Sequence, residues 1–145
     1  MKAALATHGS HGRGGRLFAG FMLGGFECST HRLKSGRRLD MVAATRHDRF
    51  CREDYARLRS QGICVAREGI RWHLIEQGPR EYDFASVAPM LDAAQENGIQ
   101  VLWDICHYGW PDGIDIFTPE FIRRYRAFAI AFATWLKEHA PGLIF

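Results

Sequence analysis

A three-part pattern recurs along the chain: an amphipathic stretch of helical period, then a glycine, then a short run rich in β-branched residues. The junctions between glycine and apolar run fall at residues 61–65 and 97–101, and a third begins at residue 141. Glycine at such a junction supplies the positive φ that ends a helix, and β-branched residues favour extended backbone. Repeats of roughly 40 residues with this order predict βα units on a parallel sheet.

The apolar runs predict strands over residues 17–28, 63–70 and 99–106, and the last residues, 141–145, read as the start of a fourth strand. Between the strands, the spacing predicts three helices. The expected N-caps, in chain order, are Asp48, Ser86 and Thr118. Pro89 and Pro119 then fall in the first turns of their helices, where proline removes no hydrogen bond. The other connections, including residues 29–47 and 107–111, are expected to be loops.

The buried stripe of the third helix is the clearest helical signal in the chain. Its apolar residues recur at helical spacing and are Phe121, Tyr125, Phe128, Phe132, Trp135 and Leu136. Together these elements predict an α/β fold: the first three βα units, plus the start of strand four, of a TIM (β/α)8 barrel. Because a whole barrel needs about 250 residues and the chain has 145, we expect a truncated barrel over residues 17–145. A flexible, glycine-containing tail over residues 1–16 is expected to precede it.

Composition excludes several classes of function. The net charge is +3, and seven lysines and arginines lie before position 39. They are not interleaved with aromatic residues on one face, so we expect a solvated segment and no nucleic-acid binding. The apolar run over residues 17–26 lacks the cleavage site of a signal peptide, and no run is long enough to span a membrane. The expectation is a cytoplasmic protein without a membrane partner.

The four cysteines are scattered and form no C-x-x-C pair: they are Cys28, Cys51, Cys64 and Cys106. We expect reduced thiols that pack as small apolar groups. A zinc site needs clustered ligands, and the spacing provides none. The sequence therefore predicts neither a metal nor a cofactor.

Polar and aromatic residues gather where the predicted strands end. They are Glu27, Ser29 and His31 after the first strand, Arg67, Glu68, Arg71 and Trp72 at the second, and Asp104, His107, Tyr108 and Trp110 at the third. In a barrel, chemistry occurs at the carboxyl ends of the strands. Rings that stack on C–H faces, beside groups that bind hydroxyls, favour a sugar ligand. Trp72 and Trp110 could equally be loop anchors, and a strand-end Arg or His could pair with a buried neighbour.

Four segments carry a family resemblance: residues 21–29, 52–58 with Gly62-Ile63, 66–72 and 104–111. In this order and spacing the chain resembles the amino-terminal part of a glycoside hydrolase family 1 protein, the β-glucosidase family, or a divergent relative in the same clan. The resemblance covers residue 17 to the end. It implies a retaining hydrolase of β-glycosides, in carbohydrate metabolism.

The resemblance also implies roles for single residues. His107 matches a histidine that binds sugar hydroxyls in the innermost subsite, and Arg67 matches an arginine beside the nucleophilic carboxylate. His31 stands where the family usually has a sugar-binding glutamine, and Glu27 where it often has a small hydroxyl residue. These two departures leave the sugar specificity open.

The catalytic carboxylates are the largest departure from the family. Retaining hydrolysis needs two carboxylic acids about 5 Å apart, and in the family they follow strands four and seven. No residue of this chain matches either position, so no catalytic residue is assigned. Three hypotheses follow: a glycoside hydrolase fragment inactive alone, a non-catalytic sugar-binding or interaction module made from a half barrel, or another enzyme class on the same fold. Open sheet edges further predict that the isolated chain is molten, aggregating or self-associating.

Overall fold

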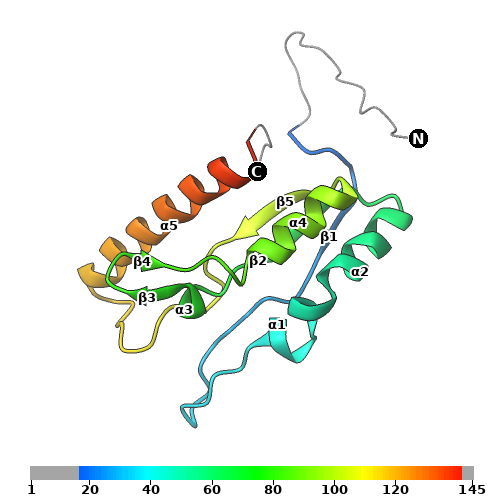
Figure 1. Ribbon diagram of the computed structural model, residues 1–145. Coiled ribbons are helices and arrows are strands. Elements are labelled where there is room, and N and C mark those ends of the chain that lie inside the picture. The colour runs from blue at the N-terminus through cyan, green and yellow to red at the C-terminus, as the bar shows by residue number, and fades with distance from the viewer. Residues whose placement is uncertain (1–16, 142–145) are drawn as a thin grey trace.

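The computed structural model describes residues 17–141, which form an α/β arrangement (Figure 1). In chain order the elements are β1 (Leu23–Gly25), α1 (Met41–Ala44), α2 (His47–Ser60), β2 (Val65–Gly69), α3 (Trp72–Ile75), β3 (Glu76–Gly78), β4 (Glu81–Tyr82), α4 (Ala88–Asn97), β5 (Gln100–Asp104) and α5 (Pro119–His139). No helix among them is long and apolar enough to cross a membrane. The predicted tail and nearly all of the predicted fourth strand lie outside the described residues.

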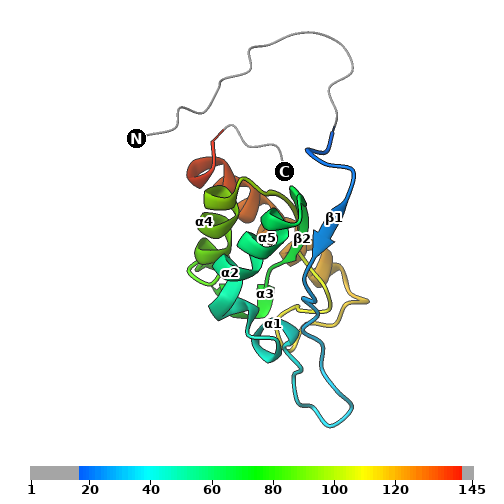
Figure 2. The ribbon, with the colours of Figure 1, turned by 90° about the vertical axis from the view of Figure 1, so that its right-hand side faces the viewer.

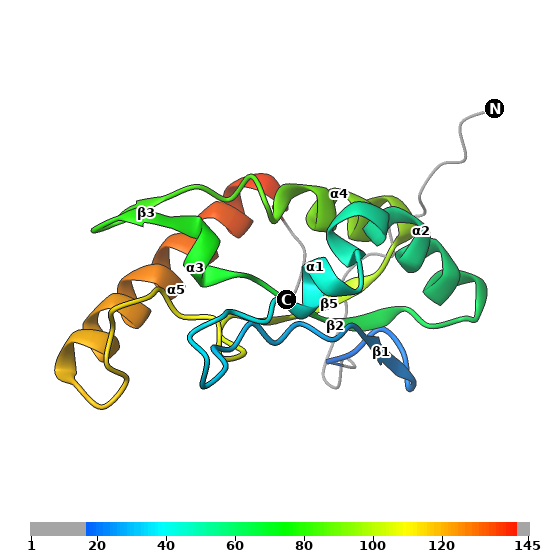
Figure 3. The same cartoon turned by 90° about the horizontal axis from the view of Figure 1, so that it is seen from below.

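The main sheet has three parallel strands in the order β1-β2-β5, with Gly25 opposite Arg67 and Glu68 opposite Trp103. The parallel sheet predicted from the repeated pattern is therefore confirmed. Helices α2 and α4 lie side by side on one side of it, as Figures 2 and 3 show. Helix α5 reaches the same side, where Phe132 packs edge-on against Trp103 at 5.5 Å.

The three strands of the main sheet follow one another in chain order, and the helices of residues 17–141 lie on one side of them. The sheet is therefore singly wound. A doubly wound sheet would reverse its strand order and place helices on both faces, whereas successive βα units of a barrel follow the order seen here. Within residues 17–141, the second face of the sheet has no helix over it (Figure 3). That face displays Arg67, Leu102 and Asp104, while Ala66, Glu68 and Trp103 point toward the helices.

The core is divided into two apolar clusters. One lies between the sheet and helices α2 and α4 and includes Tyr55, Met90 and Val101. The other lies under α5, where Trp72 stacks on Phe128 at 5.0 Å with an interplanar angle of 7°. The predicted stripe of α5 is confirmed, because its buried residues are Phe128, Phe132 and Leu136, with Phe121, Tyr125 and Trp135 partly buried beside them.

Two of the three predicted glycine junctions are confirmed. Gly62 has φ +75 just after α2, and Gly98 has φ +62 at the end of α4. A side chain there would be strained, because L-residues rarely adopt this region. The third glycine, at position 142, lies outside the described residues.

The helix starts are predicted with mixed success. Thr118 caps α5 with Pro119 as its first residue, as expected. The prediction of Asp48 as the N-cap is wrong: the N-cap is Arg46, two residues earlier, in a left-handed conformation with φ 62, and α2 starts at His47. Ser86 is also wrong as a cap, since Val87 precedes α4, although Pro89 does lie in its first turn.

Several short elements were expected to be loops. Helix α1 begins where the Asp40 carboxylate accepts a hydrogen bond from Ala43 N at 3.0 Å, and α3 with the β3–β4 hairpin follows the second strand. Elements of two to four residues are too short to show a period. The first strand is shorter than predicted, three residues in place of residues 17–28. Glycines interrupt that run, and the strand lies at the sheet edge with β2 as its partner.

Candidate functional site

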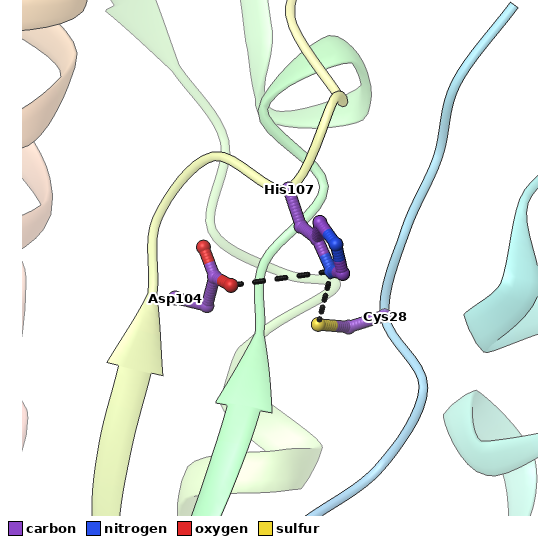
Figure 4. Close-up of side chains that lie close together, drawn as sticks. All are labelled: Cys28, Asp104 and His107. Carbon is purple, nitrogen blue, oxygen red and sulfur yellow. Dashed lines mark hydrogen bonds and ion pairs between the residues drawn. The ribbon is translucent and has the colours of Figure 1, made fainter.

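Side chains from three segments converge at the carboxyl ends of the parallel strands. Asp104 is the last residue of β5, His107 lies in the loop that follows, and Cys28 lies three residues after β1. Figure 4 shows the three side chains pointing toward one another. His107 Nδ1 lies 3.4 Å from Cys28 Sγ and 4.0 Å from Asp104 Oδ2. Asp104 and His107, the candidates at the end of β5, therefore lie beside Cys28 from the segment after β1.

Arg67 joins this group from the central strand. Its Nη2 donates a hydrogen bond to Asp104 Oδ2 and approaches His107 Nδ1 at 3.3 Å. Arg67 and Asp104 lie on the face of the sheet that bears no helix within residues 17–141, and about half of the Arg67 side chain is exposed. Within residues 17–141, Asp104 and His107 are each about a quarter exposed, whereas Cys28 is buried. We call Cys28, Arg67, Asp104 and His107 the strand-end cluster.

The loop that carries His107 is fixed by backbone hydrogen bonds. Thr30 N donates to His107 O at 3.0 Å, and His73 N donates to Gly109 O at 2.9 Å. A side chain at Gly109 would collide with Thr30 Oγ1. Tyr108 between them is exposed and has φ 60, a conformation that costs a non-glycine residue free energy. The Tyr108 ring is thus exposed to solvent beside the His107 ring, with 5.2 Å between the ring centroids.

Glu27 and His31 flank the strand-end cluster. Glu27 is exposed, and its carboxylate accepts a hydrogen bond from Ser29 N at 2.9 Å. Hydrogen bonding by Ser29 lowers the pKa of Glu27, with smaller contributions from His107 and Arg67. The carboxylate is therefore ionised at neutral pH. The half-buried His31 ring meets Tyr108 edge-on at 6.4 Å.

The two tryptophans take different positions. Trp72 is fully buried at the start of α3, and its indole Nε1 donates to Glu76 Oε2 at 2.7 Å. Trp72 therefore matches the alternative of a loop anchor. Within residues 17–141 its ring has no face open to a ligand. Trp110 is half-buried, packs edge-on against Phe121 at 6.1 Å, and its carbonyl accepts from Arg38 at 3.1 Å.

Two strand-end candidates do not reach the cluster. Glu68 is buried on the helix side of the sheet, where it accepts from Tyr55 Oη at 2.9 Å and lies 2.7 Å from His47 Nε2. Arg71 is also buried and pairs with Asp40 at 3.3 Å and Asp48 at 3.6 Å. Both side chains are therefore paired with residues outside the strand-end cluster.

Cys28 is a member of the cluster that the sequence reading placed only in the core. Burial raises the pKa of the Cys28 thiol to about 11, so it stays protonated at neutral pH. All four cysteines are free thiols. The one sequence signal for Cys28 is its position directly after Glu27 at a strand end.

The same cluster includes the atoms that could hold a metal ion. Ligand atoms of Cys28, Asp104 and His107 lie within 4.8 Å of one another, which resembles the spacing around a tetrahedral cation. The Arg67 guanidinium, however, donates into this group, and metal ligation requires the thiolate. As arranged, the four side chains form a hydrogen-bonded cluster.

A hollow of about 550 Å³ adjoins the cluster along β5. It is lined by Arg67, Leu102, Trp103, Asp104, Ile105, Cys106 and Tyr125. Its volume lies within the range of small-molecule sites. Charged groups therefore border an apolar wall that includes the Tyr125 ring of α5.

Comparison with known proteins shows the fold. No protein-family model matches the sequence, and no curated protein matches it. Among solved structures, the chain is similar to the exo-beta-1,4-mannosidase Op5Man5 from Opitutaceae bacterium strain TAV5, with a TM-score of 0.59 and 24% sequence identity. The similarity covers 83% of this chain and 23% of the mannosidase chain. The described βα units thus have the same fold as a part of that larger protein.

Proposed function

We propose that this chain forms the opening βα units of a glycoside hydrolase barrel and that its strand-end cluster binds the hydroxyls of a sugar. The observation that carries the proposal is the hydrogen-bonded group of Arg67, Asp104 and His107 on the open face of a singly wound parallel sheet. The fold shared with part of an exo-beta-1,4-mannosidase and the four segments that resemble β-glucosidases support it.

The chemistry of the cluster suits a polyol. Arginine and histidine donate hydrogen bonds and a carboxylate accepts them, so hydroxyls of either role find partners. The exposed Tyr108 ring and the hollow beside β5 supply apolar surface for the C–H face of a sugar. The exposed carboxylate of Glu27 lies where a sugar hydroxyl could donate to it.

Hydrolysis on this proposal requires residues beyond this chain. A retaining mechanism uses one carboxylic acid as acid/base and another as nucleophile, about 5 Å apart. Asp104 is paired with Arg67, and Glu68 is buried behind the sheet. The Glu27 carboxylate accepts a hydrogen bond from the backbone N–H of Ser29. Further βα units of a longer protein would supply the two catalytic acids of a β-glucosidase-like retaining reaction.

The same engagement of carboxylates favours a second candidate, a sugar-binding module without hydrolytic activity. Asp104, Glu68 and Glu27 each have a hydrogen-bond partner, which suits binding better than proton transfer. The two candidates differ in turnover and share the sugar site.

The test compares the purified 145-residue chain with a chain extended by its downstream reading frame. Both are assayed on aryl β-glucosides and β-mannosides. We expect turnover from the extended chain alone, and loss of turnover when its first downstream strand-end glutamate becomes glutamine. Turnover by the 145-residue chain, abolished by Glu27→Gln or Glu68→Gln, would contradict the proposal. A stop codon directly after Phe145, with sugar binding by the chain, would support the module.

His107→Ala probes the sugar contact in the active, extended protein. Losing a hydrogen bond to a ligand costs about 1–3 kcal/mol, so kcat/KM should fall roughly tenfold to a hundredfold while the fold is retained. His139→Ala, at the exposed end of α5, is the control and should leave kcat/KM unchanged. Unfolding of the His107 variant with unchanged activity per folded molecule would show that the histidine is structural.

A further inference from the structure

The strand-end cluster determines which nitrogen of the His107 ring carries the proton. We infer that Arg67 and Cys28 act as positioning residues that keep His107 Nδ1 as an acceptor, so that Nε2 carries the hydrogen. The ring then presents an N–H donor to the ligand. The identity of that ligand as a sugar rests on the proposed function, but the tautomer does not.

Arg67 supplies the decisive constraint. Its guanidinium group is always protonated and has donors but no acceptor. Nη2 carries two hydrogens, and the geometry gives it two partners, Asp104 Oδ2 and His107 Nδ1 at 3.3 Å. A hydrogen on Nδ1 would point at these donors and repel them. Nδ1 therefore accepts.

Cys28 supplies a second donor to the same nitrogen. Sγ lies 3.4 Å from Nδ1, and burial keeps the thiol protonated because it raises the pKa to about 11. A thiol is a weak donor, but here it is held in place. A Cβ on Gly69 would overlap Cys28 Cβ and Sγ, so the glycine allows the cysteine to sit against β2.

Asp104 acts through Arg67. Its Oδ2 lies 4.0 Å from Nδ1, which is too long for a hydrogen bond, so it does not draw a proton to that nitrogen. Its bond to Arg67 orients the guanidinium group toward the ring. In a common histidine–carboxylate pair the carboxylate would bond Nδ1–H and favour the opposite tautomer.

The far nitrogen of the ring is available for a ligand. Nε2 has no hydrogen-bond partner among residues 17–141, and the side chain is about a quarter exposed. Figure 4 shows Nδ1 facing Cys28 and Asp104. An Nε2–H donor recognises a ligand atom with a lone pair, such as a hydroxyl oxygen, and rejects a pure donor such as an ammonium group.

The experiment reads the tautomer directly from the imidazole 15N chemical shifts of the full 145-residue chain, labelled on histidine, without any ligand. We expect the Nε2–H form in the parent. Arg67→Met alters a half-exposed side chain and so does not threaten the fold, and combining it with Cys28→Ala removes both donors. The ratio of Nε2–H to Nδ1–H should then fall by roughly fivefold to 25-fold, since one lost hydrogen bond is worth about a factor of five and the two donors share one lone pair of Nδ1.

Two controls separate positioning from packing. Cys51→Ala makes the same change at another buried cysteine that does not contact His107, and it should leave the 15N shifts unchanged. Cys28→Ser, in place of Cys28→Ala in the double variant, keeps a hydrogen-bond donor beside Nδ1. It should return the tautomer ratio toward that of the parent. An Nδ1–H form in the parent, or an unchanged ratio in the double variant, would overturn the inference.

The outcome is independent of sugar binding. A titration with methyl glucoside and methyl mannoside follows the same His107 signals. The expected tautomer without any response to sugar would leave the inference standing and count against the proposed function. Sugar binding to a ring in the Nδ1–H form would do the reverse.

Discussion

At the scale of single residues, the buried His47 and the half-buried His73 lie in opposite electrostatic surroundings. His47 stacks on Phe26 at 3.8 Å and bridges Asp54 at 2.9 Å and Glu68 at 2.7 Å. Burial alone lowers the pKa of His47, but hydrogen bonds and charges of the two carboxylates outweigh it and raise the pKa above 6.5. Burial, helped by the charge of Arg38, lowers the pKa of His73 to about 4.

These two shifts predict a stability optimum. Since the folded pKa of His47 is raised, its stabilisation is complete below pH 6.5 and is lost as pH rises through the raised pKa. The folded pKa of His73 is depressed, so its contribution is complete above pH 6.5 and is lost as pH falls toward 4. The free energy of unfolding should therefore be greatest near pH 6.5, measured by urea titrations at fixed protein concentration.

Variants assign the two limbs of this pH profile. His47→Gln should flatten the alkaline limb, and His73→Gln should flatten the acid limb, while His139→Gln on the surface should alter neither. An alkaline limb that persists in His47→Gln would refute the role of the network with Asp54 and Glu68.

At the scale of the elements, β2 and α5 hold the site in place. Strand β2 lies between β1 and β5 and carries Arg67, so its close contacts align the strand ends. Helix α5 has 21 residues and contributes Phe128 and Phe132 to the core beneath the loops.

Gly69→Ala tests the contact between β2 and the segment after β1. The new methyl group would overlap Cys28, and overpacking of this kind typically costs about 1–3 kcal/mol. The loss should appear in the free energy of unfolding and in a changed His107 signal. Gly20→Ala, whose Cβ would meet its nearest atom at 3.6 Å, is the matched control. Equal stability of the two variants would show that β2 does not need this close approach.

Phe128→Ala tests the packing of α5 under the loops. The fully buried ring stacks on Trp72, and removing a buried phenylalanine costs about 3–5 kcal/mol. Ile130→Ala changes an exposed residue of the same helix and should cost much less. Thermal unfolding at one protein concentration compares the two. Similar melting temperatures would mean that α5 does not need this contact.

At the scale of the whole molecule, one face of the sheet has no helix over it within the described residues. The segment from residue 17 to the first residue of β1 exposes large apolar side chains: Leu17, Phe21, Met22 and Leu23. The β1 edge has β2 as its only strand partner among residues 17–141. Open edges and contiguous apolar surface favour association.

We therefore expect the isolated chain to self-associate, as measured by sedimentation velocity over a range of concentrations. Phe21→Asp should weaken association, because Phe21 is 93% exposed within the apolar run. Phe117→Asp is the control, since Phe117 is 90% exposed but precedes α5. A monomer that unfolds cooperatively in calorimetry and sedimentation would contradict this expectation.

Local patterns in the sequence determined the larger elements. The stripe of α5 and the positive φ at Gly62 and Gly98 depend on residues close together in the chain, so periodicity and propensity predict them. The strand-end position of Asp104 and His107 was also predictable, because parallel strands end at one edge of a sheet. Arg67, expected at the end of its strand, lies in the middle of β2 and reaches the cluster through its long side chain. Helices α1 and α3 were missed because a single turn has no measurable period.

The direction in which each side chain points was decided by the tertiary structure. Adjacent residues of a strand face opposite sides, and in β2 the run Val65–Gly69 is buried except for Arg67, so no alternation of polar and apolar residues marks the faces. Pairing with β1 and β5 places Arg67 on the open side and Glu68 against Tyr55. The contact between Cys28 and His107 joins residues 79 positions apart. Pairing of β1 and β5 with β2 brings these two residues together. Local sequence patterns act over a few residues only, so they could not predict this contact.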